Sequence, residues 1–529
     1  MKTLLLLVLL VAVSESSRVL MILSLGSASH KNIMTPLAES LGRRGHQVTI
    51  VSLHASPSNS SKAYTDLVAV NAWNIIQKVT GEFNVFKMRE ATGGKDVNSQ
   101  VMKKVLRHLP EYCDAFLRDP GVQDAWTSKP DLILLPSFMN ECGLAFVHKF
   151  KVPFMYVTTS GLTPWTADLL GNPEHPAYIP NQYLSYGDRM SLWERTMNTL
   201  VRFISPYLRS HVVLNRLEGV VQRFLGDPMV SLPEIEKNVS MVLVNSHYSL
   251  GHPRPLLPNV VEVGGMHCRK PRAIEEAELK HFLDSSQVPV VFFSLGSSIQ
   301  SDQMPISVRN SLISAFSRLP YRIVWKWEGN AILNLPDNVL TRSWIPQQDV
   351  LGHKNVQAFL THGGLLSMQE AVYHNVPVVG LPLMSDQHLN VRQSVTLGIG
   401  RELSLETLTS DAIVEAITTI IENKSYQQEV EKRSMLFRDQ ETSSLDRAVY
   451  WTEHVLRHGG AQHLRSAAAD MPIYQYMLLD VMAVLTSAAV IVLLVLKWIL
   501  MMLARALVLS SKKGTVIFLR FIGSQVKIE

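Results

Sequence analysis

The residues Thr361, His362, Gly363 and Gly364 directly follow an apolar run of strand length, VQAFL (356–360). A run that is compatible with a helix comes next, at about 366–374. In a strand, turn and helix of this kind, the free N–H groups and the positive end of the helix dipole point into the turn. Paired glycines also let a ligand approach the backbone closely. The turn therefore predicts a binding site for an anion, above all a phosphate.

Two polar residues, Asp386 and Gln387, follow the next strand-like run, 376–381, and its terminal Pro382. Open α/β sheets place their ligand contacts at the carboxyl ends of strands. A carboxylate accepts hydrogen bonds from sugar hydroxyls, and an amide side chain both donates and accepts. Either residue alone would belong to an ordinary turn. Beside the glycine turn, the pair indicates contacts to a polar ligand.

The same segment resembles a known family. At every fixed position it fits the long signature of the UDP-glycosyltransferases, which include the animal UDP-glucuronosyltransferases. The matching residues are Phe359, Leu360, Thr361, His362, Gly363, Gly364, Ser367, Glu370, Pro377, Pro382, Asp386 and Gln387. The resemblance covers nearly the full chain. It implies an α/β fold of two Rossmann-like domains that face each other across a cleft (GT-B), plus one C-terminal transmembrane helix, with the acceptor in the first domain and the UDP-sugar in the second.

The resemblance implies a role for each part of the donor site. Trp344 stacks on the uracil ring, and Gln347 hydrogen-bonds the uridine. Glu370 binds the ribose hydroxyls. Asp386 and Gln387 read the transferred sugar.

The resemblance also assigns the diphosphate to His362 and to the backbone of Gly363 and Gly364. Ser367 keeps its match to the family. Leu366 replaces an asparagine that many members have, which removes one side-chain contact near the phosphates.

A second turn is expected at the same cleft. The apolar strand 288–295 ends in Gly296, Ser297 and Ser298, and we expect Ser297 or Ser298 to contact phosphate or sugar. The chain contains no D-x-D pair, so we expect no metal bound through that motif, and the helix end to replace the cation. No cofactor is expected, because the UDP-sugar is a co-substrate.

His30 follows the first apolar strand, 18–25, at the start of a helix expected over 31–42, with Ser29 as its N-cap. The positive helix end disfavours the imidazolium, which leaves a neutral imidazole suited to general-base catalysis near pH 7. A structural histidine is the alternative. In the family that the chain resembles, the histidine of a similar loop deprotonates the acceptor hydroxyl. No G-x-G-x-x-G follows the strand, so dinucleotide binding is not expected.

A histidine base needs a carboxylate to hold its tautomer and to stabilise the imidazolium. Many family members have an acidic residue directly after the strand 131–135, but this chain has Pro136. We expect Glu141 to take that role. Asp131 is the second choice, although it lies at the wrong end of the strand. The alternative for Glu141 is that it caps the helix 141–150.

The two ends of the chain predict a secreted, membrane-anchored protein. Lys2 and the apolar run 4–13 are typical of a secretory signal peptide. Residues 481–503 are almost wholly apolar and, at about 1.5 Å per residue, long enough to span a bilayer. Basic residues follow, so the positive-inside rule places the tail in the cytosol. We expect a single-pass type I protein of the endoplasmic reticulum membrane with lumenal catalytic domains.

Composition divides the chain into six parts, with a proline-rich linker, 253–258, between the two large domains. The expected parts are a signal peptide (1–17), an N-terminal acceptor-binding Rossmann-like domain (18–257), a C-terminal UDP-sugar-binding Rossmann-like domain (258–443), a return helix and linker (444–478), a transmembrane helix (479–504) and a cytosolic tail (505–529). We expect the helix at about 444–458 to pack back on the first domain.

The three cysteines, Cys113, Cys142 and Cys268, are too few for a disulfide framework or a cysteine zinc site and allow one bridge at most. The net charge of +5 is mild and lies partly in the tail, which argues against nucleic acid as a partner. Sequons begin at Asn59, Asn238 and Asn423.

The segment 191–225 is expected to be an amphipathic helix, with Trp193, Met197, Leu200 and Phe203 recurring at helical spacing. A face packed on the core is the favoured interpretation. A wall of the acceptor pocket or a contact with the membrane surface is the alternative.

We predict an enzyme that transfers a hexosyl or glucuronosyl group from a UDP-sugar, with inversion, to a hydroxyl of a small lipophilic acceptor, as in detoxification. The membrane and a homo- or hetero-oligomeric partner are further expected contacts. Pro136 motivates an alternative, a catalytically silent UDP-sugar-binding partner subunit. A receptor that uses the fold only for ligand capture, and transfer of galactose to a lipid, are further alternatives.

Overall fold

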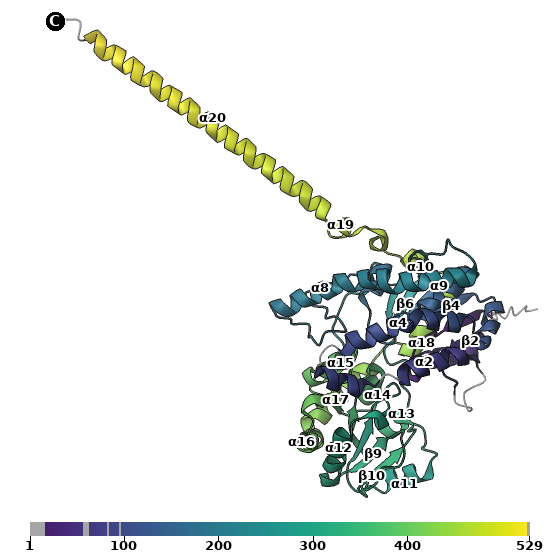
Figure 1. Cartoon of the computed structure of the whole chain (residues 1–529). Helices are drawn as coiled ribbons and strands as arrows, with labels where there is room; N and C mark the ends of the chain where they lie inside the picture. Colours follow the sequence, from purple (N-terminus) through teal and green to yellow (C-terminus); the bar gives the residue numbers. More distant parts are fainter. Residues whose placement is uncertain (1–15, 57–62, 82–83, 95–96, 526–529) are drawn as a thin grey trace, which may run out of the picture. The chain divides into compact units, whose positions relative to one another are not determined.

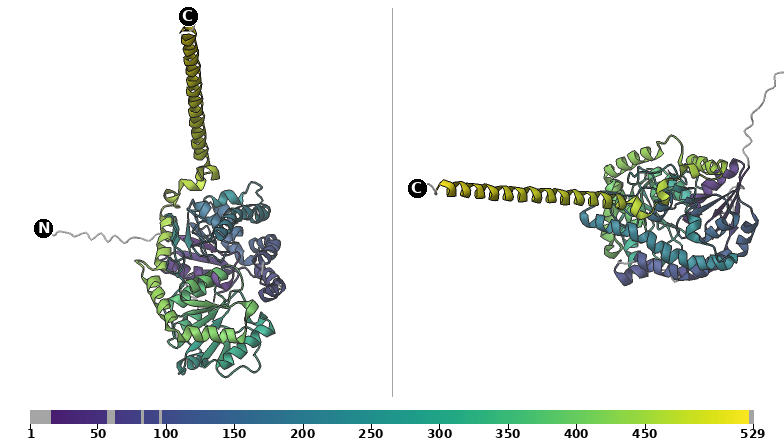
Figure 2. Two further views of the ribbon diagram at one scale, coloured as in Figure 1. Left: turned by 90° about the vertical axis from the view of Figure 1, so that its left-hand side faces the viewer. Right: turned by 90° about the horizontal axis from the view of Figure 1, so that it is seen from above.

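A computed structural model describes residues 16–525 except 57–62, 82–83 and 95–96. Most of the expected signal peptide and the first sequon therefore lie outside the described residues. Within them the chain forms a body that ends at Ala469, and a separate unit that begins at Asp470. The body contains two parallel sheets, one in each half (Figures 1 and 2).

The first sheet has seven strands, all parallel, in the order β3-β2-β1-β4-β5-β6-β7. They are β1 (Arg18–Ile22), β2 (Gln47–Ser52), β3 (Thr65–Val68), β4 (Leu132–Pro136), β5 (Phe154–Val157), β6 (Met241–Val244) and β7 (Val260–Glu262). Alternate residues of β1 pack into different clusters, Val19 and Met21 into one and Leu20 and Ile22 into the other. Both faces of the first sheet are thus covered, which explains why its strands are continuous apolar runs in the sequence.

The first half of the body also contains ten α-helices among the described residues, and most of them pack on the faces of this sheet. They are α1 (Ala28–Arg43), α2 (Val70–Gly81), α3 (Val85–Thr92), α4 (Val97–Leu117), α5 (Pro120–Gln123), α6 (Leu144–Phe150), α7 (Pro164–Leu170), α8 (Leu192–Leu208), α9 (Asn215–Leu225) and α10 (Leu232–Glu236).

The second sheet has six parallel strands in the order β10-β9-β8-β11-β12-β13. They are β8 (Val290–Ser294), β9 (Arg322–Lys326), β10 (Val339–Arg342), β11 (Val356–Thr361), β12 (Val378–Gly380) and β13 (Gly400–Glu402). The helices of this half are α11 (Ala277–Asp284), α12 (Ile306–Arg318), α13 (Gln347–Leu351), α14 (Leu365–Tyr373), α15 (Gln387–Thr396), α16 (Ser410–Glu422) and α17 (Lys424–Arg438). Two parallel Rossmann-like sheets confirm the expected fold class.

The expected domain boundary at residue 258 is wrong. β7 pairs with β6, with Val260 opposite Val242, and so completes the first sheet. The side chains of Val260 and Val261 are buried there. The prolines at 253–258 therefore mark a surface bend within the first half of the body, not its end.

The return helix packs as expected. α18 (Ser444–Arg457) places Ala448, Val449 and Val455 in the same core cluster as α1. An ion pair between Arg44 and Glu453 adds a polar contact beside it. Figures 1 and 2 show α18 beside the first sheet, whereas α16 and α17 lie with the second.

The prediction that the apolar face of the helix in 191–225 packs on the core is wrong for α8. Leu192 and Trp193 are 75% and 69% exposed, and Leu200, Phe203 and Ile204 are also exposed. Arg202 of α8 pairs instead with Asp168 of α7. The apolar stripe therefore faces outward, which the helical period alone cannot distinguish from an inward one.

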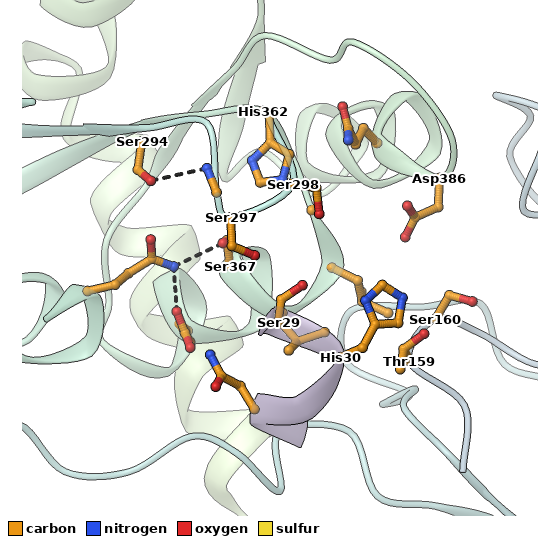
Figure 3. A pocket seen from close by; sticks show the side chains of 18 of the residues that line it. Ser29, His30, Thr159, Ser160, Ser294, Ser297, Ser298, His362, Ser367 and Asp386 are labelled. Carbon is orange, nitrogen blue, oxygen red and sulfur yellow. Dashed lines mark hydrogen bonds between the residues drawn. The ribbon is translucent and has the colours of Figure 1, made fainter. Parts of the chain in front are cut away.

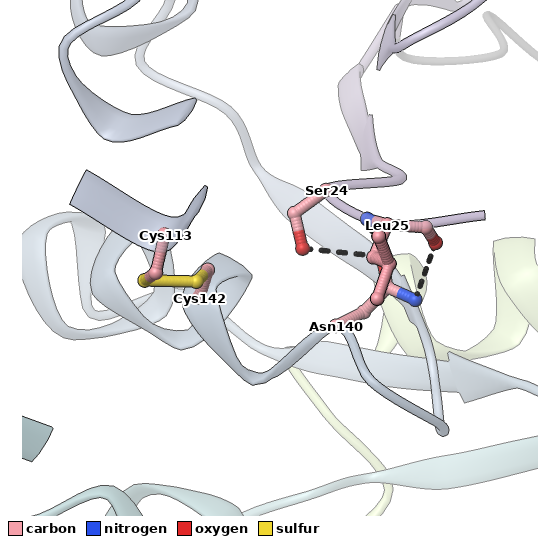
Figure 4. The surroundings of a disulfide bond; sticks show 5 residues. All are labelled: Ser24, Leu25, Cys113, Asn140 and Cys142. Carbon is pink, nitrogen blue, oxygen red and sulfur yellow. Dashed lines mark hydrogen bonds between the residues drawn. A yellow bond between two sulfur atoms is a disulfide. The ribbon is translucent and has the colours of Figure 1, made fainter. Parts of the chain in front are cut away.

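The loop after β4 is tied to the loop after β1 (Figure 4). The Asn140 side chain accepts from the Leu25 N–H at 2.9 Å and donates to the Leu25 carbonyl at 2.9 Å. A disulfide between Cys113 and Cys142 joins α4 to the same loop. These contacts hold the carboxyl ends of β1 and β4 together. The candidate base His30 follows β1 at this end of the sheet.

The unit that begins at Asp470 contains α19 (Ile473–Tyr476) and α20 (Leu479–Gln525). Leu479–Ser510 is long and apolar enough to cross a membrane, judged by length and composition. It includes the expected transmembrane helix, and α20 continues into the expected tail.

A buried ion cluster lies beneath the first half of the cleft. The Arg209 guanidinium donates to Glu141 at 3.0 Å and to Glu236 at 2.6 Å, and Tyr156 also donates to Glu236. All three charged residues are at most 9% exposed. Because one cation serves two carboxylates, removal of Arg209 leaves both without a counter-charge.

We expect Arg209→Ala to lower the free energy of unfolding of the body by about 3–5 kcal/mol, because it strands two buried carboxylates. Chemical denaturation of the detergent-solubilised chain measures this. Arg223→Ala, at an exposed position of α9, is the matched control and should change stability by less than about 0.5 kcal/mol. An Arg209 variant as stable as this control would contradict the assignment.

Candidate active site

A cavity of about 490 Å³ lies between the two halves of the body (Figure 3). His30, Ser160 and Tyr183 line it from the first half, and residues after β8, β10, β11 and β12 line it from the second. The loops after β8 and β11 stand where the strand order of the second sheet reverses, and such points are where open α/β sheets bind ligands. A volume of this size accommodates a small-molecule ligand.

Most of the residues expected from the sequence meet at this cavity. Those that line it are His30, Ser297, Trp344, Gln347, His362, Gly364, Ser367, Glu370, Asp386 and Gln387. Gly363 and Glu141 do not line it.

The His362 ring is packed between two glycines. A β-carbon on Gly296 would lie 2.6 Å from its Cε1 atom, and one on Gly364 would lie 2.6 Å from its Nε2 atom. The backbones of the turns after β8 and β11 therefore both pack closely against the imidazole of His362. Burial, together with the smaller effect of the Lys326 ammonium, lowers the pKa of His362 to about 4. The ring is neutral near pH 7.

The start of α14 adds a helix N-terminus to this turn, with Gly364 as the N-cap. The adjoining Lys326 ammonium donates to the Gly296 carbonyl at 3.0 Å and pairs with Glu328. An anion at this place would meet backbone N–H groups, the positive helix end and a neutral imidazole.

A hydrogen-bonded group joins α13 and α14 at the other end of the cavity. The Gln347 amide donates to Glu370 at 2.6 Å and to Ser367 at 2.9 Å. Burial raises the pKa of Glu370 to about 7, although the hydrogen bond from Gln347 opposes the shift. Trp344 is 63% exposed, so its ring surface is available for stacking beside this group.

The start of α15 carries the two residues assigned to the sugar, Asp386 as the N-cap and Gln387 as the first residue of the helix. Gln387 accepts from the N–H groups of Leu383 and Met384 at 2.9 and 3.1 Å, which leaves its amide Nε2 as the atom that can donate to a ligand. The Asp386 carboxylate accepts from Asn390 at 3.0 Å, and burial raises its pKa.

The expected contact of Gly363 with the diphosphate is not what the structure shows. The residue has a φ of 84°, and a β-carbon would lie 2.4 Å from Val391. Its carbonyl accepts from Asn390 at 3.0 Å. Gly363 is therefore required for the turn to pack on α15, and it lies behind the cavity wall.

His30 lies in the first turn of α1, near Thr159 and Ser160 in Figure 3. Its Nδ1 atom accepts from the Ser27 N–H at 3.2 Å and is 2.9 Å from the Ser27 hydroxyl. Burial lowers the pKa of His30 to about 4, and His54 adds to the shift. The imidazole is neutral near pH 7, as a general base requires.

The expected pairing of Glu141 with His30 is wrong. The Glu141 carboxylate accepts from Arg209 at 3.0 and 3.2 Å, away from the cavity. Asp131, the second choice, accepts from the Arg18 backbone and side chain at the opposite end of the sheet. Pro136 is the last residue of β4. Among the residues that the structure describes, the hydrogen bonds of His30 go to Ser27.

Several residues that line the cavity were not predicted from the sequence. Thr159 and Ser160 follow β5, so the carboxyl-end rule could have found them. Gln182 and Tyr183 come from a long irregular segment that carries no such signal. Over the described ranges, no group of three or more His, Cys, Asp or Glu side chains has a geometry that could hold a metal ion.

Solved structures first define the class of protein. CalG4, the calicheamicin glycosyltransferase, superposes with a TM-score of 0.55 at 19% identity, over 84% of this chain and 99% of that one. VinC, a glycosyltransferase solved with dTDP, gives a TM-score of 0.53 at 16% identity, over 84% and 99%. The fold is that of the GT-B glycosyltransferases.

Sequence comparison then identifies the family. The family model described as "UDP-glucoronosyl and UDP-glucosyl transferase" matches residues 18–514. UDP-glycosyltransferase UGT5 of Dactylopius coccus is 33% identical over 92% of each chain. The 2-hydroxyacylsphingosine 1-beta-galactosyltransferase of Rattus norvegicus is 32% identical over 91% of this chain and 87% of its own length. The chain belongs to the UDP-glycosyltransferase family and is an enzyme that transfers a sugar from a UDP-sugar.

The neutral His362 makes stability depend on pH. Its pKa is about 4 in the folded chain and 6.5 at its ordinary value, so below pH 6.5 the unfolded chain binds a proton that the folded chain does not. This contribution to stability is complete above pH 6.5 and is lost as the pH falls towards 4. The stability advantage of wild type over His362→Gln should shrink by about 2 kcal/mol between pH 7 and pH 5.

Chemical denaturation of both proteins at the two pH values measures the difference. A constant or growing advantage at pH 5 would show that the ring is already charged, or is stabilised when charged, in the folded protein.

Proposed function

We propose that the enzyme transfers the sugar to a hydroxyl of a small lipophilic acceptor, with inversion, and that His30 is the general base. One observation supports this above all: His30 lines the same cavity as Asp386 and His362, which come from the other half of the body. A base on one side of the transferred sugar and a leaving-group site on the other is the arrangement that in-line displacement requires.

In the proposed step, the imidazole of His30 removes the proton of the acceptor hydroxyl. The oxygen forms a bond to the anomeric carbon while the bond from that carbon to the diphosphate breaks. UDP leaves with the electron pair. The N-terminus of α14 and the neutral His362 stabilise its developing charge.

The Ser27 hydroxyl is proposed to take the place of the missing carboxylate. In the structure Nδ1 accepts from the Ser27 N–H, which puts the ring proton on Nε2. For Nε2 to act as the base, the proton must move to Nδ1, where the Ser27 oxygen, 2.9 Å away, can accept it. The Ser29 hydroxyl, 2.8 Å from that of Ser27, extends the chain of hydrogen bonds. A hydroxyl stabilises an imidazolium less than a carboxylate does.

Apolar side chains in the cavity support a lipophilic acceptor. Phe138 lines the cavity from the first half, and Leu365, Leu366 and Met384 line it from the second half. Apolar side chains beside polar groups that fix the orientation of a ligand are typical of sites for drug-sized lipophilic molecules. We propose detoxification of such molecules as the role.

A metal is not part of the proposed mechanism. The N–H groups at the start of α14 and the Gly296 turn supply the positive potential that a bridging cation would otherwise provide. Lys326 lines the cavity and adds a fixed positive charge beside the turn.

We propose an endoplasmic reticulum membrane protein of type I topology, with its body in the lumen. The basic residues after the apolar part of α20 support a cytosolic tail. The disulfide between Cys113 and Cys142 suits an oxidising compartment. The exposed apolar stripe of α8, interleaved with arginines, supports a contact of the body with the membrane surface.

The test is UDP release by microsomes that contain wild type or His30→Ala, with a panel of UDP-sugars, mixed phenols and steroids, and EDTA. We expect release by wild type with at least one sugar and a loss of about 10²–10⁴-fold in the variant, because only the base is removed. UDP-sugar affinity should stay unchanged. His211→Gln, an exposed histidine of the turn after α8, is the matched control.

Undiminished release by His30→Ala would refute the assigned base. Release that disappears with EDTA would refute the metal-free mechanism. UDP-sugar binding without release by wild type, with every sugar tested, would identify a silent subunit instead.

A further inference from the structure

A short segment of the first half of the body packs into the second half. We call the described residues of 84–98, which comprise α3 and the start of α4, the clasp segment. Val85, Phe86 and Val97 belong to the buried core cluster of the second sheet, together with Phe293 and Leu383. The Asn84 amide also donates to the Gln303 carbonyl at 3.1 Å. The clasp segment is therefore part of the second core although the first half supplies it.

Arg89 is the charged centre of this contact and is only 6% exposed. Its guanidinium donates to Glu406 at 2.5 and 3.0 Å. It also donates to the Leu383 carbonyl at 2.7 Å and lies 3.1 Å from Nε2 of His388. An arginine can only donate, so the His388 nitrogen accepts. The Arg89 side chain thus contacts Leu383, which precedes Asp386 and Gln387, and His388, which follows them.

The end of α3 leaves no room for this contact to shift. Gly94 has a φ of 76°, and a β-carbon there would lie 2.1 Å from the Glu406 carboxylate and 3.2 Å from the Arg89 guanidinium. The backbone of the clasp segment therefore closes directly over the ion pair.

Asn98 provides a second anchor. Its side-chain oxygen accepts from the Ser385 N–H at 2.7 Å. Ser385 has a φ of 59°, a conformation that residues other than glycine adopt at a cost. The bond stabilises this conformation directly before Asp386. Leu383, Ser385 and His388 are thus all held by the clasp segment.

The uridine end of the cavity is held by other elements. Gln347 and Glu370 bond to each other across α13 and α14, and neither contacts the clasp segment. Loss of the clasp contacts should therefore disturb the sugar end of the donor site and leave the nucleotide end in place.

We propose that Arg89 and Asn98 are positioning residues that fix Asp386 and Gln387 against the donor sugar, so that the first half of the chain helps to select the sugar. The proposal rests on the proposed function in one respect, the assignment of Asp386 and Gln387 to the sugar. Neither residue needs to touch the substrate. Both act through the backbone that carries the sugar-reading side chains.

The test compares the affinities of the full chain for UDP and for its preferred UDP-sugar. Loss of hydrogen bonds from a charged group should weaken UDP-sugar binding by about tenfold or more in Arg89→Met, while the Kd of UDP changes by less than about twofold. The ratio of kcat/KM values for two UDP-sugars should move towards one. Arg89→Lys, which keeps one donor for the Leu383 carbonyl, should recover part of the loss.

Asn98→Ala provides a variant that should leave folding intact, because Asn98 is exposed. It should show the same selective loss of UDP-sugar affinity, smaller than that of Arg89→Met. Arg107→Met, at an exposed arginine of α4, is the matched control and should leave both affinities unchanged.

Equal weakening of UDP and UDP-sugar binding in both variants would overturn the proposal, since it would indicate general damage to the site. Unchanged UDP-sugar affinity in both would overturn it as well. The affinity ratio requires no turnover, so failure of the proposed catalytic function in the His30 experiment is distinguishable from failure of this one.

Discussion

The packing of the His362 ring between Gly296 and Gly364 is the contact on which the donor site depends. It brings the turns after β8 and β11 together at the reversal point of the second sheet. A side chain at Gly296 would separate the two turns, and one at Gly364 would displace the ring, because a β-carbon at either position would overlap the imidazole. The contact therefore sets the spacing of the backbone N–H groups that face the expected diphosphate.

The same packing determines the charge of the site. Burial keeps His362 and His30 neutral and raises the pKa of Glu370 and Asp386. A donor with two negative phosphates would thus enter a cleft whose two histidines carry no charge near pH 7. Positive potential comes from backbone dipoles, the α14 N-terminus and Lys326, which need no reorganisation when charge develops on the leaving group.

The sequence predicted the fold class and most of the residues that line the cavity because these depend on local signals. Continuous apolar strands indicated parallel sheets covered on both faces, and the glycine turn indicated where an anion is expected to bind. The misses arise from contacts between distant segments. Glu141 is paired by Arg209, 68 positions away, and β7 is defined only by its pairing with β6. Arg89 acquires its partners 294 to 317 positions along the chain, and no local pattern could have revealed them. The apolar residues on the exposed face of α8 recur with the same helical period as those on a buried face, so the sequence could not distinguish the two.

The central claim is that His30 and the diphosphate site act on opposite faces of the anomeric carbon. The anomeric configuration of the product, determined by NMR from an α-linked UDP-sugar, tests this most directly. A β-linked product alone is expected, because the acceptor oxygen attacks from the first half while UDP departs into the second. An α-linked product would contradict it, since it would require a covalent intermediate or attack from the face that UDP leaves.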